Sequence, residues 1–277
     1  MSLGERWYDR ADNGHSVSFG VVGSGPPALF LHGFGLTHHT YRGALRRLAA
    51  QGLRVYAPAL PGFGGTDALP NAQRNIAGYA RWVHRFLDDQ GIDEPLTLVG
   101  HSFGGGVAIR AAFERSERIR RLVLVNSVGG GVWSSRSGDH RPLRERPLWG
   151  WGAAALSDAV ATRPPLSALA AIATDTMANA LRNPVEVWQI SRLARTADLR
   201  YELDVLARRG LPVGVVWSKG DTFIPRASFE QLRAALGNPH VHHVPGCHGW
   251  LIGNPDRFGA VMSTVLGRLL PDLSVAG

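Results

Sequence analysis

Ser102 has the sequence surroundings of a catalytic nucleophile. It lies between Gly100 and Gly104, after an apolar β-branched run and before a run of small residues suited to a helix. This order predicts a strand, a sharp turn and a helix, with the serine hydroxyl at the tip of the turn. The flanking glycines leave room for the strained backbone that such a turn imposes. A glycine-rich turn without chemistry has the same composition, so other residues have to decide between the two interpretations.

An acid and a base are available after two later strands. Asp221 follows the apolar run 213–217, and His248 follows the run 241–244 and a Pro-Gly pair. The carboxyl ends of parallel strands meet at one edge of a sheet, so Ser102, Asp221 and His248 are expected to lie together. A serine nucleophile needs such a base and an acid that orients it. Taken alone, Asp221 could equally be a turn or capping residue, and His248 an exposed loop residue.

The loop 32–35 could stabilise an oxyanion. It follows the apolar run 27–31 and contains two glycines, while Phe103 begins the helix after the nucleophile. The backbone N–H groups of Phe34 and Phe103 are therefore the predicted oxyanion donors, each typically worth about 3 kcal/mol in the transition state. Three neighbours of these groups are predicted to contact the substrate: Gly33, His101 and Trp250.

Alternating strands and helices are predicted to position these groups. Short apolar or β-branched runs predict strands at about 16–22, 27–31, 53–58, 95–100, 121–126, 212–217 and 240–244. Helical patterns fall at about 38–50, 73–90, 103–115, 226–236 and 255–269. Such alternation predicts an α/β fold with a mostly parallel central sheet that helices cover on both faces.

The alternation stops between residues 128 and 210. This stretch contains helix-like segments, several prolines and no convincing strand, so it is predicted to be a helical lid inserted after the strand at 121–126. The core is then formed by residues 1–127 and 211–277. The lid holds four tryptophans, namely Trp133, Trp149, Trp151 and Trp188. They could line an apolar substrate pocket or form the core of the lid itself.

With these segments the chain resembles the α/β-hydrolase fold family, in the branch that uses a serine nucleophile. The resemblance covers about residues 16–127 and 211–270, and the lid fits it least. Besides the turn at Ser102, it is carried by the segments Leu31–Gly35, Ala57–Gly64 and Trp217–Pro225. The order serine, aspartate, histidine along the chain is the order expected in that family. The resemblance thus implies the fold and the triad, and says little about the substrate.

Three positions depart from patterns found among relatives. Ala59 stands where many relatives have an aspartate, which is expected to remove a structural hydrogen bond and not a catalytic one. Asn126 offers no carboxylate after the strand at 121–126, where some relatives place the acid, so Asp221 has no close rival. Gly249 follows the predicted catalytic histidine, whereas carbon–carbon bond hydrolases of ring-cleavage pathways usually have a tryptophan there.

The predicted chemistry is acyl transfer through an acyl-enzyme, most broadly the hydrolysis of a carboxylic ester or related acyl compound. The runner-up is a carbon–carbon bond hydrolase, and a cofactor-free lyase or perhydrolase would use the same triad. A serine in the nucleophile position argues against epoxide hydrolases and haloalkane dehalogenases, which use an aspartate. From another class, a small-molecule receptor on the same fold would bind a ligand without turnover.

The composition limits the kinds of molecule that this protein is expected to bind. The net charge of +8 comes almost wholly from scattered arginines, since Lys219 is the single lysine, and no basic stripe suggests nucleic acid. No segment approaches the roughly 18 apolar residues of a membrane span. No metal or cofactor is expected, because alternation along the strand divides His242 and His243 between opposite faces. A small apolar acyl or aromatic substrate and a cytoplasmic location are predicted, and an apolar lid surface could also form a homodimer contact.

Overall fold

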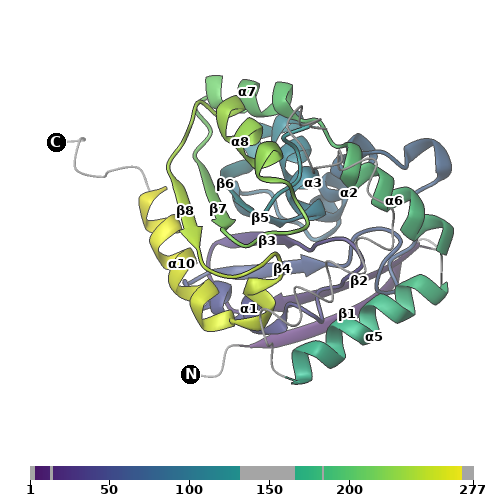
Figure 1. Ribbon diagram of the computed structural model, residues 1–277. Helices are drawn as coiled ribbons and strands as arrows, with labels where there is room; N and C mark the ends of the chain where they lie inside the picture. The colour runs from purple at the N-terminus through teal and green to yellow at the C-terminus, as the bar shows by residue number, and fades with distance from the viewer. Residues whose placement is uncertain (1–3, 13–14, 132–165, 183, 270–277) are drawn as a thin grey trace.

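A computed structural model describes residues 4–12, 15–131, 166–182 and 184–269 (Figure 1). The strands are β1 (Glu5–Asp12), β2 (His15–Val22), β3 (Pro27–Leu31), β4 (Arg54–Pro58), β5 (Leu96–His101), β6 (Ile119–Val125), β7 (Val213–Ser218) and β8 (Val241–Val244). The helices are α1 (Arg42–Ala49), η1 (Asn71–Gln73), α2 (Ile76–Asp89), α3 (Phe103–Glu114), η2 (Ser116–Arg118), α5 (Leu166–Arg182), α6 (Pro184–Thr196), α7 (Arg200–Arg208), α8 (Arg226–Ala235), α9 (Trp250–Gly253) and α10 (Pro255–Arg268).

The described strands form one sheet in the order β1-β2-β4-β3-β5-β6-β7-β8. From β4 to β8 neighbouring strands are parallel, whereas β1 and β2 are antiparallel additions at one edge. The predicted mostly parallel α/β sheet is therefore confirmed. The strand order reverses at β3, so the loops after β3 and β5 open at the centre of the sheet, where α/β folds build their sites.

Strand β1 was not among the expected strands. Its residues are strongly charged, and charge is typical of an edge strand that has water on one side. It pairs with β2 from Glu5↔Val22 to Asp12↔His15, so two residues connect the pair. These two are Asn13 and Gly14, and an Asn-Gly pair between two runs is the sequence signal for a tight hairpin that would have predicted this strand.

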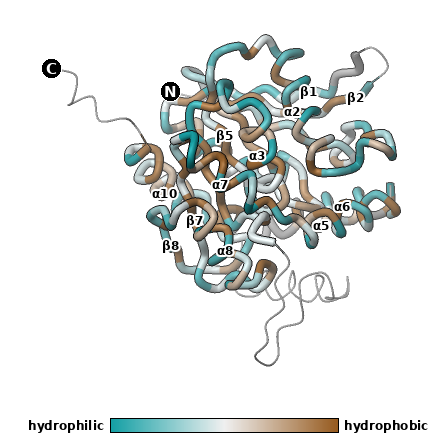
Figure 2. Tube along the Cα trace, turned by 90° about the horizontal axis from the view of Figure 1, so that it is seen from above, coloured by the Kyte–Doolittle hydropathy of each residue, from teal (hydrophilic) through white to brown (hydrophobic). Residues whose placement is uncertain are grey.

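Alternation along the strands divides the core into two layers, one on each face of the sheet. Leu98 and Leu122 face the layer that contains α2, α3, α7 and α8, while Val99 and Val123 face the layer that contains α1, α9 and α10. Figure 1 shows these two groups of helices on opposite sides of the sheet. From above, the central strands carry the brown of apolar residues and the outer helices alternate with teal (Figure 2). Burial on both faces explains why these strands read as continuous apolar runs.

Local signals set the helix boundaries within a few residues of the expected ones. Helix α2 starts at Ile76 and not at 73, because the Asn75 side chain accepts a hydrogen bond from the N–H of Gly78 and so caps the helix. Asn254 caps α10 in the same way, with Pro255 in the first turn. Residues 38–41 form turns, so α1 begins at Arg42.

Between β6 and β7 the described residues form the helices α5, α6 and α7, joined to the core by non-helical segments at 126–131 and 197–199 that pair through isolated bridges between Gly129, Gly130 and Asp198. Helices α5 and α6 contact each other and follow one another along the right-hand edge of Figure 1. Helix α7 packs instead on α3 and α8, and its Leu203 and Leu206 are buried in the core layer on that face. The predicted lid, 128–210, thus includes one helix that covers the sheet. Trp133, Trp149 and Trp151 lie outside the described residues, and Trp188 on α6 is half exposed at 46%.

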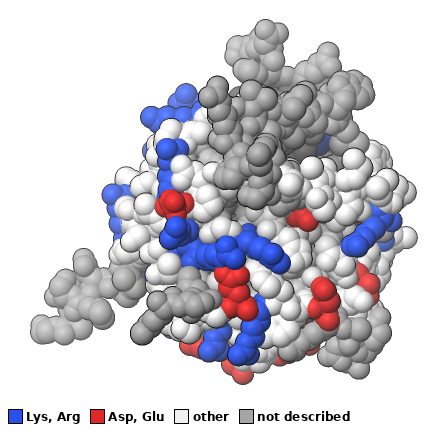
Figure 3. All heavy atoms as spheres, turned by 90° about the horizontal axis from the view of Figure 1, so that it is seen from below, with Lys and Arg blue, Asp and Glu red and all other residues white. Residues whose placement is uncertain are grey.

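Charged side chains are interspersed on the face shown in Figure 3, where arginines lie beside acidic residues. Among the described residues many arginines take part in ion pairs, as Arg118 does with Asp88 and Arg200 with Asp198. Such pairing fits scattered, solvated charge. Among the residues that the structure describes, no helix is both long and apolar enough to cross a bilayer.

Candidate active site

Ser102 stands between β5 and α3 in a backbone conformation that few residues adopt. Its φ is 54° and its ψ is −119°, as the predicted turn requires. A Cβ on Gly104 would come within 2.3 Å of the carbonyl oxygen of Leu31, and one on Gly100 within 2.6 Å of the Gly104 oxygen. The glycines are therefore needed because β3, β5 and α3 meet with their backbones in contact.

Asp221 and His248 are in direct contact. The Nδ1 atom of His248 lies 2.8 Å from Oδ2 of Asp221, and the aspartate side chain is fully buried. Two backbone N–H groups, from Phe223 and Ile224, donate to the other carboxylate oxygen at 2.8 and 3.0 Å. A carboxylate that accepts these bonds is held in a fixed position, so it orients the imidazole with its Nδ1–H toward Asp221.

Asn126 also holds this pair, although no role was predicted for it from the sequence. Its Nδ2 group donates to Asp221 Oδ2 at 2.6 Å and to the Ser218 hydroxyl oxygen at 2.7 Å. Its Oδ1 accepts from the indole N–H of Trp250 at 3.0 Å. Asn126 is fully buried with φ 43°, a region that asparagine tolerates better than most residues. Its place at the end of β6, one strand from the nucleophile, was the available signal.

His32 fixes the orientation of the predicted oxyanion donor at Phe34. Nε2 of His32 accepts from the N–H of Leu60 at 2.8 Å, so Nδ1 carries the proton and donates to the carbonyl oxygen of Gly33 at 2.8 Å. In a trans peptide the carbonyl and the next N–H point in opposite directions, so the N–H of Phe34 points away from His32. Burial lowers the pKa of His32 to about 4, which keeps this neutral tautomer in place.

A buried chain of hydrogen bonds joins the loop 32–35, here termed the oxyanion loop for its predicted donor Phe34, to the loop that carries His248. The N–H of Gly33 donates to the Tyr41 hydroxyl at 3.1 Å, and that hydroxyl lies 2.7 Å from Nδ1 of His101. Nε2 of His101 lies 3.1 Å from the carbonyl oxygen of His248, so it must donate there, and Tyr41 donates to Nδ1. Burial, and then the nearby His248 ring, lowers the pKa of His101 well below its usual range.

The structure thus brings most of the predicted site residues together. Gly33 lies against Ser102, since a Cβ on this glycine would be 3.3 Å from the serine Cβ. His101 and Trp250 are 2% and 1% exposed, and both are bonded inside the protein, to Tyr41 and Asn126 respectively. Their predicted contact with substrate stays a prediction, while the hydrogen bonds give them a supporting role.

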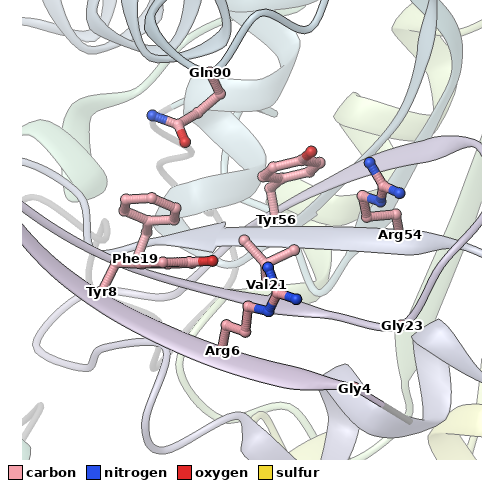
Figure 4. Close-up of a pocket in the computed structure, with 9 residues that line it drawn as sticks. All are labelled: Gly4, Arg6, Tyr8, Phe19, Val21, Gly23, Arg54, Tyr56 and Gln90. Carbon is pink, nitrogen blue, oxygen red and sulfur yellow. The ribbon is translucent and has the colours of Figure 1, made fainter.

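A cavity of about 330 Å³ lies elsewhere, on the outer strands β1, β2 and β4 (Figure 4). Phe19 and Val21 form part of its wall, and Arg6 and Arg54 stand at one side of it in the close-up. Its lining residues are Gly4, Arg6, Tyr8, Phe19, Val21, Gly23, Arg54, Tyr56 and Gln90. None of them is a predicted site residue, so the triad and this cavity are separate features.

Comparison with known proteins decides the family. The model of the alpha/beta hydrolase family matches residues 28–261, a range that includes Ser102, Asp221 and His248. The chain belongs to the alpha/beta hydrolase family. Among solved structures of this fold, a serine hydrolase involved in carbazole degradation superposes with a TM-score of 0.72 at 22% identity, over 96% of this chain and all of the other.

Two relatives of higher identity match only part of this chain. A 2-hydroxymuconate semialdehyde hydrolase of Pseudomonas putida is 38% identical over 122 residues, 42% of this chain and 41% of the relative. An uncharacterized protein of Mycobacterium tuberculosis is 40% identical over 123 residues, which cover 44% of this chain and 35% of that protein. The matched region spans about a third to two fifths of these relatives, so their activities are not transferred on this ground.

Proposed function

We propose that this hydrolase cleaves a carboxylic ester or related acyl compound through Ser102, His248 and Asp221. The observation that carries the proposal is the 2.8 Å contact between His248 Nδ1 and a buried Asp221 carboxylate; the His248 ring also packs on His101, the residue before Ser102, whose φ is 54°. A buried pair of this kind adds little stability by itself but gives the base a defined tautomer. The substrate class that fits is a small molecule with an apolar acyl or aromatic group, in a cytoplasmic setting.

In the proposed reaction His248 takes the hydroxyl proton of Ser102 as the oxygen attacks the carbonyl carbon. Asp221 stabilises the imidazolium that forms, since it accepts the Nδ1–H bond and is itself held by Asn126. The backbone N–H groups of Phe34 and Phe103 donate to the oxyanion. His248 then protonates the leaving group, and water releases the acyl group from Ser102 by the same steps.

A carbon–carbon bond hydrolase is the second candidate. The partial match with a 2-hydroxymuconate semialdehyde hydrolase favours it, and the same nucleophile, base and oxyanion donors would serve. The glycine at 249 departs from the pattern expected of such enzymes, which is why ester hydrolysis is placed first. Hydrolysis of a ring-cleavage product at a rate above that of any ester would reverse this order.

The test is turnover of p-nitrophenyl esters of increasing chain length by the wild type and by Ser102→Ala. The expected result is a wild-type activity that falls by at least about 10³-fold in the variant, together with labelling of Ser102 by a fluorophosphonate, read by mass spectrometry. Activity that survives Ser102→Ala would exclude the nucleophile assignment. Tight ligand binding with no turnover and no labelling would instead favour a receptor.

A further inference from the structure

Helix α5 of the insertion is hydrogen-bonded to the loop that carries Phe34. Oδ2 of Asp175 accepts from the backbone N–H of Thr37 at 3.0 Å and from the Thr37 hydroxyl at 2.6 Å. The hydroxyl of Thr40 donates to the same oxygen at 2.5 Å. One carboxylate oxygen therefore gathers three donors from the segment that directly follows the oxyanion loop.

Asn179, one helical turn further along α5, continues this attachment. Its Nδ2 group donates to the carbonyl oxygen of Gly35 at 3.0 Å, and its Oδ1 accepts from the N–H of Gly64 at 3.1 Å. Asparagine 179 is 4% exposed, so its amide is committed to these two loops. Residues four apart lie on one face of a helix, and Asp175 and Asn179 therefore act from the same side of α5.

The bonded groups have few alternatives to α5. Thr37 and Thr40 are 2% and 6% exposed, so water cannot easily replace the carboxylate of Asp175 as their acceptor. Gly35 adopts φ 76°, and its carbonyl oxygen accepts from Asn179, which makes it the first group after Phe34 that is hydrogen-bonded to α5. Without α5 the loop would keep its anchors at Gly33 and lose those on the far side of Phe34.

We propose that Asp175 and Asn179 are positioning residues for the oxyanion donor of Phe34, so that the inserted helix is part of the catalytic machinery. This inference rests on the proposed function. Neither side chain touches the reacting atoms. They act on the loop from 35 to 40, and His32 and Tyr41 fix its beginning from the core.

A neighbouring contact of the insertion supplies a control. On α6, Oε1 of Gln189 accepts from the Arg74 guanidinium at 2.9 Å, on the far side of the Gly62–Gly64 turn from the oxyanion loop. Gln189→Glu changes an amide to a carboxylate, as Asn179→Asp does, but it keeps an acceptor for Arg74. Gln189→Glu therefore adds the same negative charge to the insertion as Asn179→Asp does. Only Asn179→Asp places a carboxylate oxygen against a carbonyl oxygen, that of Gly35.

The experiment compares Asp175→Asn, Asn179→Asp and Gln189→Glu. Steady-state kinetics with p-nitrophenyl butyrate give kcat and KM, and hydrogen exchange reports on the amides of Thr37 and Gly64. The first two variants are expected to lower kcat by about 10- to 100-fold with KM changed less than about threefold, and to speed exchange at these amides. Gln189→Glu is expected to keep kcat within about twofold.

Asp175→Asn removes a negative charge and Asn179→Asp adds one, so a fall in kcat in both variants cannot come from a general electrostatic effect. Wild-type kcat in both, with Ser102 still labelled by the fluorophosphonate, would overturn the positioning role and leave the proposed function intact. A fall of the same size in Gln189→Glu would overturn it as well. If a variant unfolds, Thr40→Val, which removes one donor and no acceptor, provides a milder measurement with the same expected direction.

Discussion

The two sides of Ser102 are held by different parts of the molecule. On the acid–base side, Asp221 is bonded to His248 and to Asn126, and Asn126 accepts from Trp250; Asn126 and Trp250 lie in the core between the sheet and its helices. The oxyanion side begins in the same core but ends on α5. The two sides therefore should respond differently to mutation. The groups that bond Asp221 also stabilise the fold, whereas the orientation of the oxyanion loop beyond Phe34 depends on a helix of the insertion.

The largest effect is expected from Asn126→Leu, which removes every hydrogen bond of this side chain. Asp221 loses a buried donor and Trp250 loses the acceptor of its N–H, and each unsatisfied group costs about 1–3 kcal/mol. We expect the free energy of unfolding to fall by about 3 kcal/mol and kcat by at least 10-fold. Urea denaturation and ester kinetics measure the two quantities.

Ser218→Ala is the control for Asn126→Leu, because it removes one acceptor of the Asn126 amide and leaves the other bonds in place. It should lower stability by about 1 kcal/mol with kcat nearly unchanged. An Asn126→Leu protein that lost activity at full stability would show that the acid–base side is not built into the core as described.

A smaller effect is expected from Tyr41→Phe, which cuts the chain of bonds between the two sides. Gly33 loses the acceptor of its N–H, and His101 loses the donor to its Nδ1 atom. We expect kcat to fall by about 10-fold, because both the oxyanion loop and the His248 loop gain freedom. The ¹⁵N chemical shifts of His101 should show the Nε2–H tautomer in the wild type and an altered Nδ1 shift in the variant.

Tyr79→Phe is the matched control, since Tyr79 is as buried as Tyr41 and its ring packs on Phe103, but its hydroxyl donates to the carbonyl of Pro61 and is outside the chain through His101. It should cost stability of about 1 kcal/mol and leave kcat unchanged. Equal kcat losses in the two variants would mean that any buried tyrosine hydroxyl has this effect, and that the chain through His101 carries no special coupling.

Sequence reasoning predicted the parts that follow from short-range patterns. The parallel strands, the turn at Ser102 and the contact of Asp221 with His248 depend on apolar runs, on glycine spacing and on the rule that strand ends meet. Strand β1 was missed because its many charged residues do not form an apolar run, and such a composition is tolerated only in an edge strand. The extent of the lid is a prediction that the described residues do not test, although α7 packs on the core.

The supporting residues could not be predicted because their roles depend on long-range contacts. Asp175 lies 138 residues from Thr37 in the chain, and no local pattern links them. Asn126 was noted only for lacking a carboxylate, although its amide reaches Asp221. His101 was expected to contact the substrate, which stays a prediction, and the bonds of its two ring nitrogens to Tyr41 and to the His248 backbone were not foreseen. Side-chain direction at a strand end is set by packing, which a single sequence does not reveal.

The smallest effect at neutral pH, and the one that separates the two sides in acid, concerns His38. This residue follows the oxyanion loop, is 1% exposed and stacks on Trp7, and neither ring nitrogen has a hydrogen-bond partner in the described part of the chain. Burial lowers the pKa of His38 to about 2, whereas the unfolded chain takes up the proton near pH 6.5. The unfolded state therefore binds more protons below pH 6.5, and stability falls as the pH decreases.

Each such histidine removes about 1.4 kcal/mol of stability per pH unit below 6.5, until its folded pKa is reached. For His32 this window closes at about pH 4, and for His38 at about pH 2. His38→Phe keeps the stacking on Trp7 and should reduce the slope of stability between pH 6 and 4 by that amount, as measured by urea denaturation. Because His32 and His38 both adjoin the oxyanion loop, hydrogen exchange at mild acid should rise there before it rises around Asn126, and the reverse order would contradict the division of the site into two sides.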